Sequence, residues 1–304
     1  MIQEWQKLGL LYCPSPQDRH PKLLTHAANP VPLLLAGDVY RIFYSGRDKD
    51  NRSSVGAVDI DIVKQQVIQE HTQPFFEHGP AGSFYADGVS IGNFYTVGQT
   101  TYLLFMGWQN PPGQHWYGNI GRLILQADGR LSLESDTPFL PLDEVDPISL
   151  SYPWVTYRQE QYHMWYGSTV TWDAGNQEML HVIHYAHSKD GQQWTRHGAS
   201  VPYGVGLAQA FSRPTVFEDK DGLTMWFSYR DGRGQPYRIG MAKSSDYQSW
   251  TLHLAEVGLD VSANGWDANM IEYPFVLAHK GSKYMFYNGD GYGRSGFGLA
   301  KQDL

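Results

Sequence analysis

The sequence is short of several features that would place it in particular classes of protein. Its 304 residues include one cysteine, Cys13, so no disulfide can form within the chain and a reducing compartment is expected. The first thirty residues contain no basic start followed by an apolar run, as a signal peptide would. No apolar stretch approaches the roughly 20 residues needed to cross a bilayer. We therefore expect a cytoplasmic protein without a membrane partner.

Positive charge is also scarce. Lys and Arg number 23 against 31 Asp and Glu, which gives a formal net charge of -8. A nucleic-acid partner is not expected, because such proteins usually carry a basic surface. The sequence contains no metal-ligand spacing, phosphate-binding glycine loop or nucleophile elbow, so we expect no metal and no cofactor. Nothing in it indicates an oligomeric state.

Aromatic residues, in contrast, are abundant. They make up 14% of the chain and include 20 Tyr and 10 Trp. One interpretation is β-rich structure, since aromatic side chains pack well on pleated surfaces. The other is a carbohydrate site, where aromatic faces stack on sugar rings. The two interpretations are compatible.

An internal repeat predicts the fold. Five segments combine a small or polar pair, usually with proline, and alternating apolar residues, and they align at positions 30, 88, 153, 214 and 274. Each continues with a hairpin turn, an aromatic-rich second strand, a third strand around a small residue and, where complete, a fourth strand that begins at a tryptophan. Such radial repetition of four antiparallel strands is typical of a β-propeller. We predict one all-β domain over residues 1–304, a five-bladed propeller with blades starting near residues 29, 87, 151, 212 and 272.

The last repeat ends where its fourth strand should begin. Residues 4–8 (Glu-Trp-Gln-Lys-Leu) resemble residues 193–197 and 249–253, which start the fourth strands of blades three and four. We therefore predict that the N-terminal strand is the fourth strand of blade five. This pairing closes the ring and removes open sheet edges.

In this architecture the starts of the five first strands converge on one mouth of the central channel, together with the ends of the second strands. Single polar residues at strand starts are often only turn formers, but a converging group of charged residues predicts a site, because burying charge is costly. The candidate residues at this mouth are Asn29, Arg47, Asp87, Trp108, Ser151, Tyr152, Arg213, Arg230, Asp231, Glu272 and Asn288.

Two carboxylates of this group, Asp87 and Glu272, are the candidate catalytic pair. Carboxylates that face each other across a channel suit glycoside hydrolysis, one as acid and the other as base or nucleophile. Alternatively, Arg213 holds Glu272 in a structural ion pair. Asp267, five residues before Glu272, is a second acidic candidate for the mouth.

His184 is a further candidate, because three other blades carry glycine at its position in the third strand. It is either a proton donor or sugar ligand, or a hydrogen-bonded histidine of the core. His26, just before blade one, is a weaker candidate.

The repeat, the Ser-x-Asp-x-x-x-Trp turns and the segment from Tyr284 to Gly289 resemble the five-bladed-propeller glycosidase superfamily over the whole chain. That superfamily includes arabinanases and xylosidases, invertases and levansucrases, and mannoside phosphorylases. The resemblance implies an Asp in blade one, an Asp in blade two and a Glu in blade three. Here these places hold Asn29, Asp87 and Ser151, so the acid pair has either been relocated or been lost.

The leading hypothesis is a carbohydrate-active enzyme that acts on a glycosidic bond of a small saccharide. Trp108 and Tyr152 would stack on sugar, while the arginines Arg213 and Arg230 also allow an acidic or phosphorylated saccharide, or phosphate as the attacking group. One alternative is a non-catalytic sugar-binding propeller. Another is a sugar-modifying or sugar-transferring enzyme of polysaccharide biosynthesis.

Overall fold

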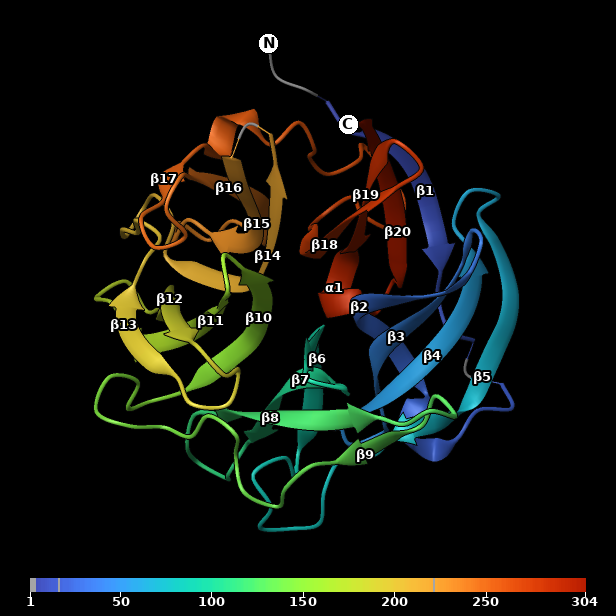
Figure 1. The fold of residues 1–304 in the computed structure, drawn as a ribbon, viewed down its shortest axis with the longest axis horizontal. Helices are drawn as coiled ribbons and strands as arrows, with labels where there is room; N and C mark the ends of the chain where they lie inside the picture. The colour runs from blue at the N-terminus through green and yellow to red at the C-terminus, as the bar shows by residue number, and fades with distance from the viewer. Residues whose placement is uncertain (1–3, 16, 221) are drawn as a thin grey trace.

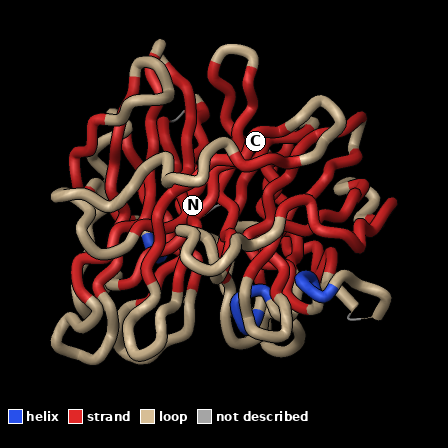
Figure 2. Tube along the Cα trace, turned by 90° about the horizontal axis from the view of Figure 1, so that it is seen from below, coloured by secondary structure: helices blue, strands red, loops and turns tan. Residues whose placement is uncertain are grey.

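A computed structural model describes residues 4–15, 17–220 and 222–304, and most of them lie in β-strands (Figure 1). Hydrogen-bond pairing gives one four-stranded and two eight-stranded sheets. Each eight-stranded sheet consists of two runs of four antiparallel strands joined by a single parallel bridge, and the resulting runs of four are called units one to five here. Figure 1 shows the five units around a common centre, with the first strand of each unit innermost. Figure 2, seen from the side, shows the loops gathered at the two opposite ends of the strands.

The units follow the order of the chain, except that the first strand belongs to the last unit. Unit one contains β2 (Thr25–Ala36), β3 (Val39–Arg47), β4 (Ser53–Asp61) and β5 (Gln66–Phe76), and unit two contains β6 (Gly88–Val97), β7 (Thr100–Gln109), β8 (Tyr117–Leu125) and β9 (Leu131–Leu133). Unit three contains β10 (Leu150–Arg158), β11 (Gln161–Thr171), β12 (Leu180–Ser188) and β13 (Thr195–Ala199), and unit four contains β14 (Ala210–Asp219), β15 (Gly222–Arg230), β16 (Arg238–Ser244) and β17 (Thr251–Leu252). Unit five contains β18 (Glu272–His279), β19 (Ser282–Asn288), β20 (Phe297–Asp303) and β1 (Gln6–Tyr12).

In the part of the chain that the structure describes, helical structure is confined to three short turns, namely η1 (Pro21–Leu23), η2 (Leu254–Glu256) and α1 (Asp290–Gly293). Over the described residues, no helix has the length and apolar character required to pass through a membrane.

The N-terminal strand pairs as the sequence predicts. In β1, Gln6 lies opposite Lys301 of β20, and the four-stranded sheet runs in the order β1, β20, β19, β18. An ion pair of 2.7 Å between Lys7 and Asp267 adds a side-chain link between the two ends of the chain. The predicted partner of the N-terminal strand is thus confirmed.

The turn before each tryptophan has a local cause. In unit three, one carboxylate oxygen of Asp190 accepts hydrogen bonds from the backbone N–H groups of Gln192 and Gln193, both at 2.8 Å. Asp246 makes the same two bonds in unit four. An aspartate that accepts from the backbone two and three residues later stabilises a tight turn. The repeated Ser-x-Asp-x-x-x-Trp pattern therefore ends the third strand and starts the fourth.

Each first strand contains a bulge. In unit three the register shifts between Ser151 and Trp154, and Tyr152 inside the bulge has a φ of 37°. The same shift and a positive φ occur at Asn29, Arg213 and Tyr273, each directly before a proline. Residues other than glycine seldom adopt this conformation. Its repetition therefore identifies equivalent positions in four units.

The bulge of unit two corrects the predicted alignment. The register shifts between Ile91 and Phe94, so Asn93 and not Gly88 corresponds to the prolines of the other units. Unit two lacks that proline, and the Asn93 amide instead bonds the backbone N–H and C=O of Val155 in unit three, at 2.9 and 2.8 Å. Asp87 consequently lies well before its bulge, whereas Glu272 directly precedes the bulge residue of unit five.

Arg213 joins the first strands. Its guanidinium donates hydrogen bonds to the carbonyls of Pro30 in unit one and Ile91 in unit two, both at 2.9 Å. The side chain is 1% exposed, and burial lowers the pKa of Arg213 to about 9. Because buried carbonyls without donors are destabilising, this arginine stabilises the centre of the molecule.

Candidate functional site

A cavity of about 470 Å³ lies at one end of the strands. The loops between second and third strands in all five units contribute to its lining. These loop residues are Asn51 in unit one, Asn110, His115 and Trp116 in unit two, Trp172 and Met179 in unit three, Tyr237 in unit four and Tyr292 in unit five. Because five separate units meet around this one cavity, it is called the mouth pocket here.

The strands themselves supply the rest of the lining. First strands contribute Ser90, Ser151, Tyr152, Phe211, Ser212 and Tyr273, and the ends of second strands contribute Arg47, Trp108 and Arg230, beside Met106. The side chains at the bulges are turned by the backbone conformation described above, and Tyr152 and Tyr273 meet there with their hydroxyls 3.3 Å apart. The predicted convergence of first-strand starts and second-strand ends therefore describes this pocket.

Aromatic rings form much of the pocket wall. Trp172 stacks on His115 at 4.6 Å between ring centroids and meets Trp116 edge-on at 5.0 Å. Across units one and two, the Arg47 guanidinium lies 5.9 Å from the Trp108 ring. Flat aromatic surfaces with polar groups at their edges are suited to the apolar faces and hydroxyls of a sugar ring.

Glu272 is buried directly before Tyr273, a residue of the pocket lining, and does not itself line the cavity. It is 0% exposed, and neither carboxyl oxygen has a hydrogen-bond partner among the residues that the structure describes. Burial raises the pKa of Glu272 well above its usual range, and the charges of Arg47 and Arg230 only partly oppose this. A raised pKa favours the protonated carboxyl, which is the form that can donate a proton.

Two arginines place positive charge in the lining of the pocket. Arg47 and Arg230 both line it, and Arg230 lies 3.6 Å from Glu178, a carboxylate that the sequence analysis did not single out. The Nε of Arg230 is buried and has no hydrogen-bond partner within the described part of the chain. Guanidinium groups arranged in this way can bind a carboxylate, a phosphate or a sugar hydroxyl.

A buried histidine, His181, also lines the pocket. His181 Nε2 lies 2.6 Å from the Ser151 hydroxyl, and its Nδ1 lies 2.7 Å from the Thr169 hydroxyl. Burial lowers the pKa of His181 to about 3, so the imidazole is neutral at pH 7. It therefore fixes the orientation of Ser151 at the pocket wall and adds no charge.

Several predicted site residues lie outside the pocket lining. Asn288 is fully buried and bonds the backbone of unit one, accepting from Asn29 N–H at 2.9 Å and donating to the Ala27 carbonyl at 2.7 Å. Asn29 is itself buried at a bulge. Arg213 donates to backbone carbonyls, as described above. These three residues connect the units, and none of them lines the cavity.

Two further candidates are engaged in ion pairs. His184 Nδ1 lies 2.8 Å from an oxygen of Asp146, which is completely buried, so this histidine faces a buried carboxylate of the core. Asp267 is paired with Lys7 and accepts a hydrogen bond from the Tyr287 hydroxyl at 3.1 Å. Neither lines the mouth pocket.

Asp87 and Asp231 lie near the pocket without lining it. An Asp87 carboxylate oxygen accepts a hydrogen bond of 2.7 Å from the backbone N–H of Asn110, which does line the pocket. Asp231 accepts one of 2.8 Å from the backbone N–H of Arg233. Asp87 thus contacts the pocket wall through its hydrogen bond with Asn110.

The sequence analysis missed the aromatic residues of the loops and His181. A usable signal was present, because the ends of the second strands were expected at the mouth and the loops that directly follow them carry His115, Trp116 and Trp172. Over the residues described, no three His, Cys, Asp or Glu side chains come together as the ligands of a metal ion would.

Solved structures with a similar fold include glycoside hydrolases. One described as "Glycoside hydrolase" matches with a TM-score of 0.75 at 14% identity, covering 100% of this chain and 93% of that one. Another, from work on the GH130 family of mannoside phosphorylases and its glycoside hydrolases, matches with a TM-score of 0.71 at 12% identity, covering 100% and 94%. The GH32 β-fructofuranosidase of Bombyx mori matches with a TM-score of 0.65 at 12% identity, covering 91% of this chain and 61% of that one.

Relatives in sequence come from Mycobacterium tuberculosis. Uncharacterized protein MT1551 (strain CDC 1551 / Oshkosh) and uncharacterized protein Rv1502 (strain ATCC 25618 / H37Rv) are each 41% identical over 298 residues, which cover 97% of this chain and 98% of theirs. No family model matches the chain. The chain therefore belongs to one family with these two mycobacterial proteins, and it has the propeller fold of the GH130- and GH32-type glycoside hydrolases.

Proposed function

We propose that this protein cleaves or transfers a glycosidic bond in the mouth pocket, with Glu272 as the group that protonates the departing sugar oxygen. The observation that carries the proposal is the burial of Glu272 with both oxygens unpartnered in the described structure. Leaving such a group without a partner is destabilising. The oxygen of the glycosidic bond would accept the proton of Glu272 in the transition state. The carboxyl would then have a hydrogen-bond partner at the step in which the bond is cleaved.

Two candidates remain for the group that attacks the sugar. Asp87 could activate a water molecule, since it contacts the pocket wall through Asn110. Alternatively, phosphate or another anion held by Arg47 and Arg230 could attack directly, and no second carboxylate would then be needed. The same arginines would equally bind an acidic or phosphorylated saccharide.

We also propose that the five units form one closed ring, and hence a single domain. Loops of all five units line the same pocket, β1 pairs with β20, and Arg213 bonds to units one and two from unit four. Deleting residues 1–10 should then lower the unfolding temperature sharply, because β20 would lose its outer partner. A truncated protein as stable as the full chain would contradict closure by β1.

A non-catalytic sugar-binding propeller is the second candidate. It is favoured by Ser151 and Asn29, which stand where the glycosidase superfamily carries acidic residues, and by the engagement of Ser151 with His181. This candidate predicts saturable binding of a glycan without turnover. A sugar-transferring enzyme of polysaccharide synthesis would use the same pocket with an activated sugar donor.

The test is mass spectrometry on a panel of oligosaccharides incubated with the wild-type protein and with Glu272→Gln, each with and without phosphate. A product formed by the wild type alone supports the enzyme, and its dependence on phosphate separates phosphorolysis from hydrolysis. Binding without any product supports the sugar-binding candidate. Equal product from both proteins removes Glu272 from the mechanism.

A further inference from the structure

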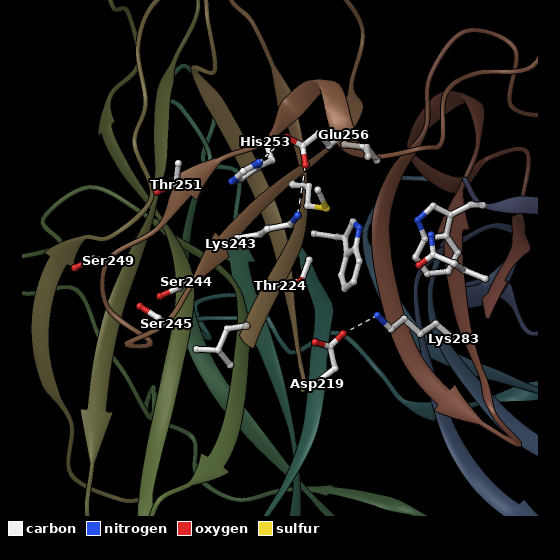
Figure 3. A pocket seen from close by; sticks show the side chains of 16 residues that line it. Asp219, Thr224, Lys243, Ser244, Ser245, Ser249, Thr251, His253, Glu256 and Lys283 are labelled. Carbon is white, nitrogen blue, oxygen red and sulfur yellow. Dashed lines mark hydrogen bonds and ion pairs between the residues drawn. The ribbon is translucent and has the colours of Figure 1, made fainter. Parts of the chain in front are cut away.

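A second cavity, of about 540 Å³, lies between units four and five (Figure 3). Strand β15 shows how far it is from the mouth pocket, because Leu223 and Thr224 at its beginning line this cavity while Arg230 at its end lines the mouth. The rise of a β-strand separates those ends by about 20 Å. The cavity also takes Lys283 from the beginning of β19, so it opens at the end of the strands opposite the mouth. It is called the groove pocket here.

The charged residues of the groove pocket neutralise one another. Lys283 lies 2.8 Å from Asp219, and the two side chains point toward each other in Figure 3. Lys243 lies 3.4 Å from Glu256, which also lies 2.8 Å from the ring of His253. Each lysine therefore has its own carboxylate among the described lining residues. Nothing in this arrangement selects a strongly charged ligand, but every pair offers charge-assisted hydrogen bonds to a polar one.

Hydroxyl groups line the cavity beside these pairs, and Thr224 lies between them. Figure 3 shows Thr224, Ser244, Ser245, Ser249 and Thr251 around the cavity. Thr224 is half-buried and Ser245 and Thr251 are exposed, so their hydroxyls are accessible to a ligand. Each can both donate and accept. A ligand that carries many hydroxyls could both donate hydrogen bonds to this lining and accept them from it.

An apolar wall completes the cavity. Trp5 and Trp226 line it and meet edge-on, with ring centroids 5.8 Å apart, and Met241 lies next to them in the lining. A saccharide combines apolar C–H faces with neutral hydroxyls, whereas a nucleotide or a sugar phosphate would need an unpaired cation. Size agrees, because a cavity of this volume lies in the range of small-molecule sites.

We propose that the groove pocket is a second binding site, separate from the mouth, and that its ligand is a neutral saccharide. Thr224, Ser245 and Thr251 would bond its hydroxyls, and the ion pairs Lys283–Asp219 and Lys243–Glu256 would bond others without a net charge. The inference does not depend on bond cleavage at the mouth. A glycan held here would keep a polymeric ligand on the protein while the mouth engages one of its ends.

The test is a calorimetric titration with neutral probes (mannotetraose, maltotetraose and nystose) and anionic probes (tetragalacturonate and inorganic phosphate). The protein is Trp116→Ala, which impairs the mouth and leaves the groove pocket intact. The double variant Thr224→Val/Thr251→Val in the same background removes two hydroxyls at constant shape. The control is Thr195→Val, because Thr195 follows Trp194 in unit three as Thr251 follows Trp250 in unit four.

We expect at least one neutral probe to bind Trp116→Ala, and the double variant to weaken this binding by about tenfold or more, since each lost hydrogen bond costs a factor of roughly 3 to 10. The control should bind as Trp116→Ala does. Absence of binding by all neutral probes, equal affinity in the double variant, or preference for the anionic probes would each overturn the proposal. None of these outcomes affects Glu272, whose role is tested separately by product formation.

Discussion

Among the residues that the structure describes, two carboxyl groups are 0% exposed, those of Asp146 and Glu272, and they differ in their surroundings. Asp146, at 0% exposure, lies 2.8 Å from His184, accepts the Tyr166 hydroxyl at 2.8 Å and lies 2.9 Å from Arg196. Burial alone would raise the pKa of Asp146, but the hydrogen bonds, that from His184 foremost, outweigh it and lower the pKa to about 2. Glu272 is equally buried without a hydrogen-bond partner in the described structure, and its pKa is raised well above the usual range.

The comparison shows that burial does not by itself indicate function. A buried carboxylate that is held by a cation and a hydrogen-bond donor of its own protein connects parts of the fold, as Arg196 and the Tyr166 hydroxyl hold Asp146. A buried carboxyl without such partners beside a cavity is available to a ligand. The predictions below separate these two roles.

The largest expected effect is on activity. Glu272→Gln should reduce turnover of any substrate found in the panel by about 1,000-fold, because a general acid contributes roughly 10²–10⁴ to the rate. The unfolding temperature should stay at or above that of the wild type, since the amide occupies the same volume and cannot ionise. Activity and thermal unfolding measured on one preparation check both points, and unchanged turnover would contradict the assignment.

The matched change at the other carboxyl should affect stability instead. Asp146→Asn leaves Arg196 and His184 without their anion, which should lower the free energy of unfolding by about 3 kcal/mol. Turnover per folded molecule should remain close to that of the wild type. Urea unfolding followed by fluorescence measures the first quantity, and a variant as stable as the wild type would refute the structural role.

The two groups should also give opposite dependences of stability on pH. Because the folded pKa of Glu272 is raised, its contribution is fully present below the unfolded value near 4.5 and is lost as the pH rises toward the folded pKa. Because the folded pKa of Asp146 is lowered to about 2, its contribution is present above the unfolded value of 3.8 and is lost as the pH falls toward 2.

Urea unfolding at a series of pH values measures this dependence. Glu272→Gln should gain stability relative to the wild type as the pH rises, and Asp146→Asn should approach the wild type as the pH falls below about 4. Parallel curves for all three proteins would mean that neither group has a shifted pKa.

The smallest effect concerns one donor to Asp146. Tyr166→Phe removes the hydroxyl that bonds Asp146 and keeps the ring, so it should lower the free energy of unfolding by about 1 kcal/mol. Since Arg196 and His184 remain, the loss should be smaller than that of Asp146→Asn. An equal or larger loss would show that the ring environment, and not the hydrogen bond, is responsible.

The fold could be predicted from the sequence because the same turn residues recur from unit to unit. The aspartate of the turn before Trp194 recurs before Trp250, and the residues around Trp5 resemble those around both, which led to the correct pairing of β1 with β20. The alignment of unit two was wrong because Asn93 replaces proline there and bonds unit three through its side chain. A side-chain amide in that role leaves no pattern in a single sequence.

The candidate site could be predicted from the sequence only in part. Glu272 stood out as the one glutamate at the start of a first strand, and Arg47, Trp108, Ser151, Tyr152 and Arg230 were expected at the mouth and do line the pocket. Arg213, Asn29 and Asn288 were expected at the same mouth, but their donors and acceptors are used between units. The position of a residue in its strand predicts which end of the molecule it occupies. Whether its side chain bonds the backbone of a neighbouring unit or lines the cavity depends on the geometry of the bulge.

The central claim is that burial raises the pKa of Glu272 well above its usual range, because the charges of Arg47 and Arg230 only partly offset the loss of water around the carboxylate. Carbon-13 NMR of protein labelled at the glutamate side-chain carboxyl, with Glu272→Gln to identify the resonance, measures this directly. The account predicts a resonance that titrates well above 4.5. A resonance that titrates near 4.5, as an exposed glutamate would, contradicts the account.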